Sequence, residues 1–295
     1  MAERLRAEGL TLAYDRRVVA EKLGIGIPDG SLTVIVGPNA CGKSTLLHAL
    51  ARIIKPQEGA VLLDGRPIAA MSPKSLAQHL GLLPQSPTTP DGITVADLVA
   101  RGRFPYQKLL RQWSADDDAA VVSAMRATGV TELAHRLVDE LSGGQRQRVW
   151  LAMALAQETP ILLLDEPTTF LDIAHQVDVL DLCAELREER QRTVVAVLHD
   201  LNHACRYATH LIAMRDGEVV AQGAPGDIVT AELVEEVFGL RCRIITDPET
   251  DTPLVLPLAR RSRTAEEPAP APSLTKDRAD AAMDQAATGA PRVSA

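Results

Sequence analysis

The chain has 295 residues, of which 46% are hydrophobic, 24% are charged and only 3% are aromatic. This length allows one large domain or two smaller ones, with a core that aliphatic side chains must fill. The net charge of -8 argues against a nucleic-acid partner, because the phosphates would repel the protein.

Three further absences narrow the class of protein. The charged N-terminus, MAERLRAEGL, does not resemble a signal peptide, and no run of about 18 apolar residues predicts a membrane span. The four cysteines form neither a close-spaced metal pattern nor a disulfide framework. We therefore expect a soluble, cytoplasmic protein whose link to any membrane runs through a partner.

The first half of the chain alternates between strand-like and helical patterns. Residues 32–36, LTVIV, predict a buried strand that ends at Gly37, and residues 44–54 predict the helix that follows. Residues 60–68 predict a strand, an Asp-Gly turn and a return strand, and GLLP at 81–84 predicts another short strand.

The hydrophobic pattern of the sequence changes at about residue 91. From there to residue 140, helical patterns replace the strand-like runs. Strands are predicted again further on, at 161–165, 193–198 and 210–223. The pattern predicts an α/β fold, with one domain over residues 1–258 and a helical subdomain inserted at about 91–144. Residues 259–295 are rich in Ala, Pro and charge, which predicts a disordered tail.

A glycine loop follows the first predicted strand. The sequence GPNACGKS fits G-x-x-x-x-G-K-[ST] between a strand and a helix, so its amides and the helix start can cradle phosphate. Lys43 would neutralise the β- and γ-phosphates of ATP, Ser44 would ligate Mg²⁺, and Thr45 would bind a more proximal phosphate. The predicted nucleotide-binding residues here are Gly37, Pro38, Asn39, Ala40, Cys41, Gly42, Lys43, Ser44 and Thr45.

Two acids end the aliphatic run ILLLDE. A buried strand would deliver Asp165 to the sheet edge where ligands gather, so Asp165 is a predicted Mg²⁺ ligand and Glu166 the predicted general base. His199 ends a similar run and is predicted to contact the γ-phosphate and the attacking water. Gln85, after GLLP, is predicted to reach the metal or that water.

The run LSGGQ at 141–145 is the second predicted anion site, because a serine hydroxyl and glycine amides head a helix that starts near Gln145. Its predicted binding residues are Ser142, Gly143, Gly144 and Gln145. Two anion-binding helix starts in one chain indicate a nucleotide that is sandwiched between two copies. Asp172, in FLD, is a further predicted binding residue, and the simpler alternative for it is a helix N-cap.

These motifs, GPNACGKST, Gln85, LSGGQRQR, ILLLDEP, FLD and His199, occur in the order found in ABC transporter ATPase subunits. The resemblance covers residues 1–258 and implies a P-loop NTPase core of the ABC ATPase type with an antiparallel β subdomain. It implies a head-to-tail homodimer in which LSGGQ acts in trans and Asp172 crosses the interface. It also implies that Tyr14, in LTLAYDRR, stacks on adenine.

Ala40 and Cys41 occupy variable positions of the glycine loop. Many relatives carry glycine where this chain has Ala40, a variable position of the motif. Cys41 lies close to Lys43 and to a helix N-terminus, which predicts some thiolate character. We expect alkylation of this thiol to inactivate the enzyme and MgATP to protect it.

The cargo is indicated by resemblance alone. The segments 81–107 and 198–230 are similar to those of the subgroup that serves ferric-siderophore importers, whose close relatives serve vitamin B12 and haem uptake. The family docks its permease on the stretch from Gln85 to Tyr106, although an ordinary surface loop is an alternative there. The expected partners are a permease and a siderophore-binding protein, at the cytoplasmic face of the cell membrane.

A soluble ABC protein that acts on DNA or ribosomes is the other class to weigh. Most such proteins carry two cassettes, a long coiled-coil insert or zinc cysteines, and this sequence has a single LSGGQ and a short insert. The transporter interpretation is therefore favoured.

Overall fold

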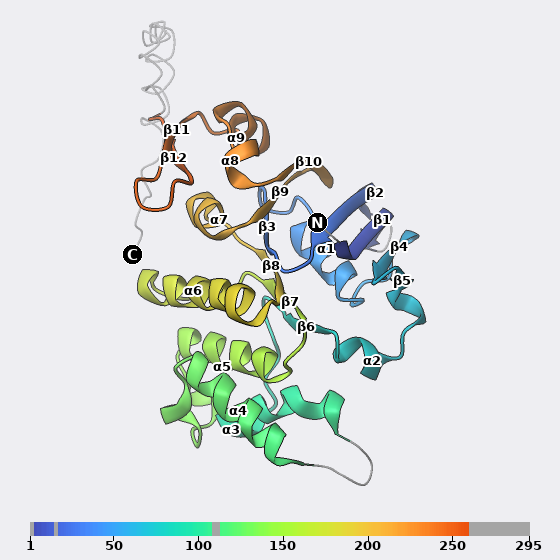
Figure 1. The fold of residues 1–295 in the computed structure, drawn as a ribbon, viewed down its shortest axis with the longest axis vertical. Helices are drawn as coiled ribbons and strands as arrows, with labels where there is room; N and C mark the ends of the chain where they lie inside the picture. Colours follow the sequence, from blue (N-terminus) through green and yellow to red (C-terminus); the bar gives the residue numbers. More distant parts are fainter. Residues whose placement is uncertain (1–2, 15–16, 108–112, 260–295) are drawn as a thin grey trace, which may run out of the picture. The chain divides into compact units, whose positions relative to one another are not determined.

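A six-stranded sheet is the centre of the fold (Figure 1). The computed structural model describes residues 3–14, 17–107 and 113–259. Every pairing in this sheet is parallel except that of its last two strands in sequence. Its strands, in spatial order, are β10 (Glu218–Gly223), β9 (His210–Arg215), β3 (Leu32–Val36), β8 (Thr193–Val197), β7 (Ile161–Asp165) and β6 (Leu80–Leu83).

The predicted aliphatic strands are confirmed almost residue for residue. All five positions of β3, β7 and β8 are buried, as expected for parallel strands that are covered on both faces. The predicted helix after the glycine loop, α1 (Lys43–Leu50), ends four residues earlier than expected. Arg52 has a positive φ of 59°, which no helix interior tolerates.

A second, four-stranded antiparallel sheet covers α1. Its strands are, in spatial order, β2 (Arg17–Pro28), β1 (Glu3–Tyr14), β4 (Glu58–Leu63) and β5 (Arg66–Pro67). Buried side chains of β1, β2 and β4 form one hydrophobic cluster with α1 and with one face of the six-stranded sheet. The α/β fold of ABC ATPase type, with its antiparallel β subdomain, is thereby confirmed.

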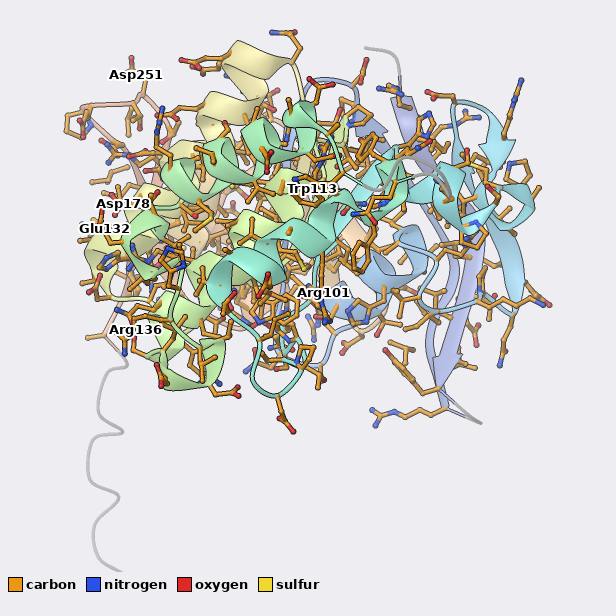
Figure 2. The ribbon with its side chains drawn as sticks, turned by 90° about the horizontal axis from the view of Figure 1, so that it is seen from below. Arg101, Trp113, Glu132, Arg136, Asp178 and Asp251 are labelled. Atoms are coloured by element: carbon orange, nitrogen blue, oxygen red, sulfur yellow. The ribbon has the colours of Figure 1, made fainter. Side chains whose placement is uncertain are left out.

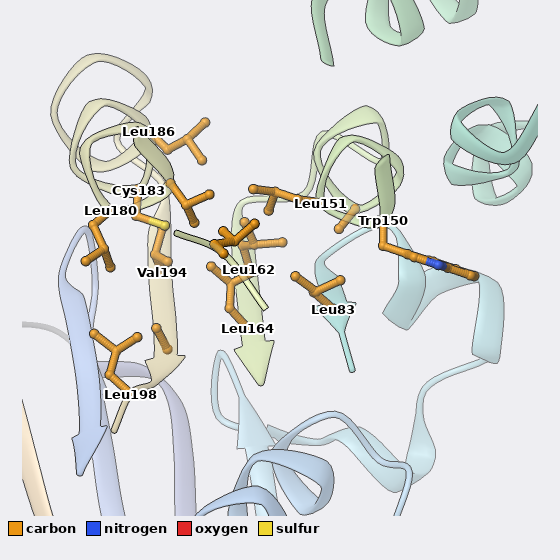
Figure 3. Packing of buried hydrophobic residues seen from close by; sticks show 14 of the residues in the cluster. Leu83, Trp150, Leu151, Leu162, Leu164, Leu180, Cys183, Leu186, Val194 and Leu198 are labelled. Atoms are coloured by element: carbon orange, nitrogen blue, oxygen red, sulfur yellow. The ribbon is translucent and has the colours of Figure 1, made fainter. Parts of the chain in front are cut away.

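Helices cover the other face of the large sheet. Figure 3 shows Trp150 and Leu151 of α5 (Gly143–Ala156) beside Leu83 and Leu162 of the sheet. Leu180, Cys183 and Leu186 of α6 (Ile173–Arg190) pack in the same cluster near Val194 and Leu198. This aliphatic layer holds the two helices whose N-termini carry LSGGQ and FLD.

Between β6 and β7 the described residues form helices and one isolated bridge, between Thr94 and Leu137. Besides α5, the helices are α3 (Val95–Ala100), η2 (Arg101–Tyr106), α4 (Ala115–Ala127), η3 (Thr131–Leu133) and η4 (Val138–Glu140). Figure 2 labels Arg101, Trp113, Glu132 and Arg136 along this segment. The domain boundaries given above, including the tail, stay a prediction, and residues 260–295 lie outside the described residues.

The remaining elements surround the two sheets. They are η1 (Ile68–Ala70), α2 (Pro73–Ala77), α7 (Leu201–Tyr207), α8 (Pro225–Ile228), α9 (Ala231–Phe238), β11 (Cys242–Thr246) and β12 (Pro253–Pro257). The side-chain amide of Asn202 on α7 bonds to both the N–H and the C=O of Val255, which joins the β11–β12 hairpin to α7. Among the described helices, none is both long enough and apolar enough to cross a membrane.

A buried cation ties the inserted helices to the core. Arg103 is 4% exposed, and its guanidinium donates to Asp117 on α4, to the carbonyl of Ala156 at the end of α5 and to Glu158, each at 2.8 Å. It also lies 4.3 Å from the ring centroid of Tyr106. The hydrogen bond from Arg103 lowers the pKa of the Asp117 carboxyl below its ordinary value.

We expect Arg103→Met to lower the free energy of unfolding by about 3 kcal/mol at neutral pH, because it leaves Asp117 buried without its cation. The difference from wild type should shrink below about pH 4, since a carboxyl with a depressed folded pKa loses its stabilisation as pH falls through that pKa. Urea titrations across pH measure both effects. The control is Arg4→Met, which breaks the exposed pair with Asp64 and should cost less than about 1 kcal/mol; equal losses in the two variants would contradict the prediction.

Candidate functional site

Two positions of the phosphate loop require glycine, one because of a close backbone contact and one because of its φ angle. A Cβ on Gly37 would lie 2.2 Å from the carbonyl oxygen of Met214 on β9. Gly42, the N-cap of α1, has a φ of 105°, a conformation that favours glycine. The loop can therefore wrap tightly around the start of α1.

The start of α1 is arranged to bind an anion. Gly42 offers no side-chain cap, and the first helical hydrogen bond runs from Leu46 to the Gly42 carbonyl. The amides of Lys43, Ser44 and Thr45 precede that bond, so they can donate to a ligand at the positive end of the helix dipole.

Lys43 is held inside the loop itself. The residue is 5% exposed, and its ammonium donates to the carbonyls of Gly37 at 2.9 Å and Pro38 at 2.8 Å. Since an ammonium has three N–H donors, a third can reach a phosphate oxygen. The backbone thus pre-positions the positive charge.

A cleft of about 770 Å³ opens beside this loop. It brings together ten of the residues predicted from sequence: Tyr14, Asn39, Ala40, Gly42, Lys43, Ser44, Thr45, Gln85, Glu166 and His199. Tyr14 is half exposed at the end of β1, which leaves its ring available to a flat ligand.

Five residues that line the cleft were not predicted: Arg17, Val18, Val19, Asp216 and Gly217. They come from the start of β2 and from the turn between β9 and β10. Gly217 donates its N–H to the Cys41 carbonyl, and a Cβ on it would lie 2.0 Å from the Val19 carbonyl oxygen. The Asp-Gly turn was the available signal, but only the tertiary fold brings it to the glycine loop.

Two of the three predicted metal ligands, Ser44 and Asp165, are in contact. Asp165 is fully buried, and its Oδ1 accepts a hydrogen bond from the Ser44 hydroxyl at 2.8 Å. Its Oδ2 accepts no hydrogen bond from the described residues, although His48 Nε2 lies 3.2 Å away. A buried carboxylate oxygen without a hydrogen bond, next to a hydroxyl, fits the oxygen ligands that Mg²⁺ prefers.

The predicted catalytic residues form a network around Glu166. Its Oε2 accepts hydrogen bonds from Gln85 Nε2 at 2.8 Å and from the Thr169 hydroxyl at 3.2 Å. Its Oε1 lies 2.6 Å from His199 Nε2. Since Gln85 donates through its nitrogen, its carbonyl oxygen is the atom that can reach a metal. Thr169 was not predicted, because nothing in the sequence marks a threonine three residues after an acid as its partner.

The residues of LSGGQ do not line this cleft. Helix α5 begins at Gly143, two residues before the predicted start, and Ser142 and Gln145 cap it reciprocally in a capping box. Ser142 and Gly143 are exposed. Asp172 accepts from the His175 N–H as the N-cap of α6, so the simpler alternative for this residue is confirmed.

The expectation for Cys41 is wrong. Its side chain is buried in the cluster that contains α1, and this burial raises the pKa of the thiol, although the charge of Lys43 opposes the effect. Proximity to a cation was visible in the sequence, but the desolvation that outweighs it was not. A reactive thiolate is therefore not expected at this position.

Ala40 has a φ of 61°, a left-handed conformation that is strained for a residue with a Cβ. We expect Ala40→Gly to raise the free energy of unfolding by about 1 kcal/mol, because relief of this strain exceeds the added entropy of the unfolded chain. Urea unfolding without nucleotide measures this. Ala49→Gly inside α1 is the matched control, which should instead destabilise by about 1 kcal/mol; destabilisation by both would contradict the strain argument.

Comparisons with known proteins agree with this geometry. Residues 20–169 match the family model described as ABC transporter. The ferric enterobactin transport ATP-binding protein FepC of Escherichia coli is 60% identical over 257 residues, which cover 87% of this chain and 95% of the relative. A probable siderophore transport system ATP-binding protein, YusV of Bacillus subtilis, is 52% identical over 87% of this chain and 93% of its own length. The petrobactin import ATP-binding protein FpuD of Bacillus anthracis is 50% identical over 90% and 98%.

Solved structures agree as well. A bacterial ABC transporter cassette solved as a dimer has a TM-score of 0.68 at 28% identity, covering 75% of this chain and 98% of that one. A post-hydrolysis dimer of the same cassette, bound to ADP and Pi, aligns with the same scores.

Proposed function

This chain belongs to the ABC transporter family, and we propose that it is the ATP-hydrolysing subunit that energises import of a ferric siderophore through a membrane permease. The observation that carries the proposal is the cleft lined by the buried Lys43 and by the Glu166–His199 pair. Ser44, which also lines it, is hydrogen-bonded to the buried Asp165 just behind. The siderophore cargo is supported by the three relatives named above, each at least 50% identical.

In the proposed complex, the loop and the first turn of α1 bind the phosphates of ATP, and Lys43 neutralises the β- and γ-phosphates. Tyr14 stacks on the adenine ring. Ser44, Gln85 and Asp165 hold Mg²⁺, which supplies charge neutralisation at the transferred phosphate when it is bound.

Hydrolysis is assigned to Glu166. Its carboxylate polarises the water that attacks the γ-phosphorus and accepts a proton from it as the bond to ADP breaks. His199, whose Nε2 lies beside Glu166 Oε1, is placed to contact the γ-phosphate and the same water. The hydrogen bonds from Gln85 and Thr169 hold the other carboxylate oxygen, so the base is oriented before ATP arrives.

The cleft supplies only half of the proposed site. Ser142, Gly143, Gly144 and Gln145 lie outside it, so we propose that they bind the nucleotide of a second copy in a head-to-tail homodimer. Asp172, at the exposed start of α6, would cross the same interface. The similar cassettes that were solved as dimers support the dimer itself.

The proposed permease surface is the stretch from Gln85 to Tyr106. Phe104 is 59% exposed there, and Arg101 on the same stretch is exposed as well, which suits a partner helix with apolar and acidic groups. This contact would hold the subunit peripherally at the cytoplasmic face of the cell membrane. A siderophore-binding protein would deliver the cargo to the same system.

We expect Glu166→Gln to retain ATP affinity while lowering the turnover of ATP by at least about 100-fold, the usual contribution of a general base. Because the bound ATP then persists, the variant should elute as an ATP-dependent dimer in size-exclusion chromatography. The matched control, Lys43→Ala, should lose nucleotide affinity itself. Wild-type turnover in Glu166→Gln would refute the assignment.

The transported substrate is tested by co-expression of this chain with a ferric-siderophore permease and its binding protein in a strain that lacks its own siderophore importers. Uptake of a ⁵⁵Fe-siderophore should require this chain and fail with Glu166→Gln. Uptake of cobalamin or haem instead, or growth that does not depend on the chain, would overturn the siderophore proposal while leaving the ATPase assignment intact.

A further inference from the structure

A buried glutamine connects the LSGGQ helix to the turn that carries the general base. Gln147 lies on α5, five residues after Ser142, and is 6% exposed. Its Nε2 donates a hydrogen bond to the carbonyl of Pro167 at 3.3 Å. A buried side-chain amide without a hydrogen-bond partner is costly in free energy, so this bond stabilises the contact between the two elements.

The carbonyl that Gln147 binds belongs to the turn that orients Glu166. The turn is closed by a backbone hydrogen bond from Thr169 to the Glu166 carbonyl at 3.2 Å, and the Thr169 hydroxyl binds the Glu166 carboxylate. Glu166 itself has a φ of 53°, a conformation that persists only where surrounding contacts impose it.

A second contact joins the same two elements. A Cβ on Gly144 would lie 3.2 Å from Leu171 Cδ2 and 3.4 Å from the Phe170 carbonyl oxygen. The first turn of α5 therefore rests on the chain just after the catalytic turn, and the start of α5 cannot shift without moving its neighbours.

We propose that Gln147 is a positioning residue for ATP hydrolysis, which transmits the placement of the LSGGQ helix to Glu166 of the same chain. This inference rests on the proposed function, in which LSGGQ binds the partner's nucleotide and Glu166 activates the water that attacks the nucleotide of its own chain. When the partner's nucleotide seats α5, the Gln147 bond fixes Pro167 and the base beside it. The two ATP sites of the dimer are thereby linked through each chain.

The chain offers a matched control on the same helix. Gln157 follows α5 directly, and its amide likewise donates to backbone carbonyls, those of Ala77 and Leu80. Ala77 ends α2 and Leu80 begins β6, so both carbonyls lie outside the catalytic turn. Gln157 therefore shares the chemistry and the structural role of Gln147 without the link to Glu166.

The test compares Gln147→Met with Gln157→Met, since methionine keeps the length of the side chain and removes the donor. We expect Gln147→Met to lower kcat roughly tenfold with KM nearly unchanged, because a small displacement of the base is costly. Gln157→Met should retain wild-type kcat, while both variants lower Tm to a similar degree. ATP affinity, measured by equilibrium binding, should not change in either.

A double-mutant cycle with Thr169→Val completes the test. Because Gln147 and Thr169 act on one turn, their effects on kcat should be non-additive, whereas those of Gln157 and Thr169 should add. The inference is overturned if Gln147→Met keeps kcat within twofold of wild type, if Gln157→Met loses as much, or if Gln147 and Thr169 are additive. Absence of ATP hydrolysis by the wild-type dimer would instead refute the proposed function.

Discussion

The hydrogen bond between Ser44 and Asp165 joins the two halves of the nucleotide site. Ser44 belongs to the helix after β3, and Asp165 is the last residue of β7, with β8 between the two strands. Because parallel strands present their carboxyl ends at one edge, this bond forms without distortion of either strand. The bond also supplies a hydrogen-bond donor to a fully buried carboxylate, whose burial would be costly without one.

Polar groups that would be costly in a core are here concentrated and mutually satisfied. Lys43 donates to two loop carbonyls, and the Glu166 carboxylate is contacted by the side chains of Gln85, Thr169 and His199. Ala40, Glu166 and Phe170 in this region have positive φ, a strained conformation for residues with a Cβ. The surrounding aliphatic clusters supply the rigidity that holds these conformations in place.

The LSGGQ residues are close to the general base but lie outside the cleft. They head a helix that packs on the chain just after Glu166, although they do not line the cleft of their own chain. In the proposed dimer, a ligand at the start of α5 and the base Glu166, just after β7, would therefore be connected through the structure although they belong to different sites. Such a connection would let assembly of the dimer influence catalysis without adding a residue to the reacting centre.

The sequence by itself determined the elements and groups whose signals are local. Continuous aliphatic runs predicted β3, β7 and β8, and fixed spacing predicted the phosphate loop, the metal ligands and the base. Only the tertiary structure decided features that depend on distant contacts. Strand β1 was missed because a bulge near Gly9 breaks its alternation, and burial reversed the expectation for Cys41. The link from Gln147 to Pro167 spans 20 residues, and no local pattern can encode it, because it exists only once α5 has packed against the sheet.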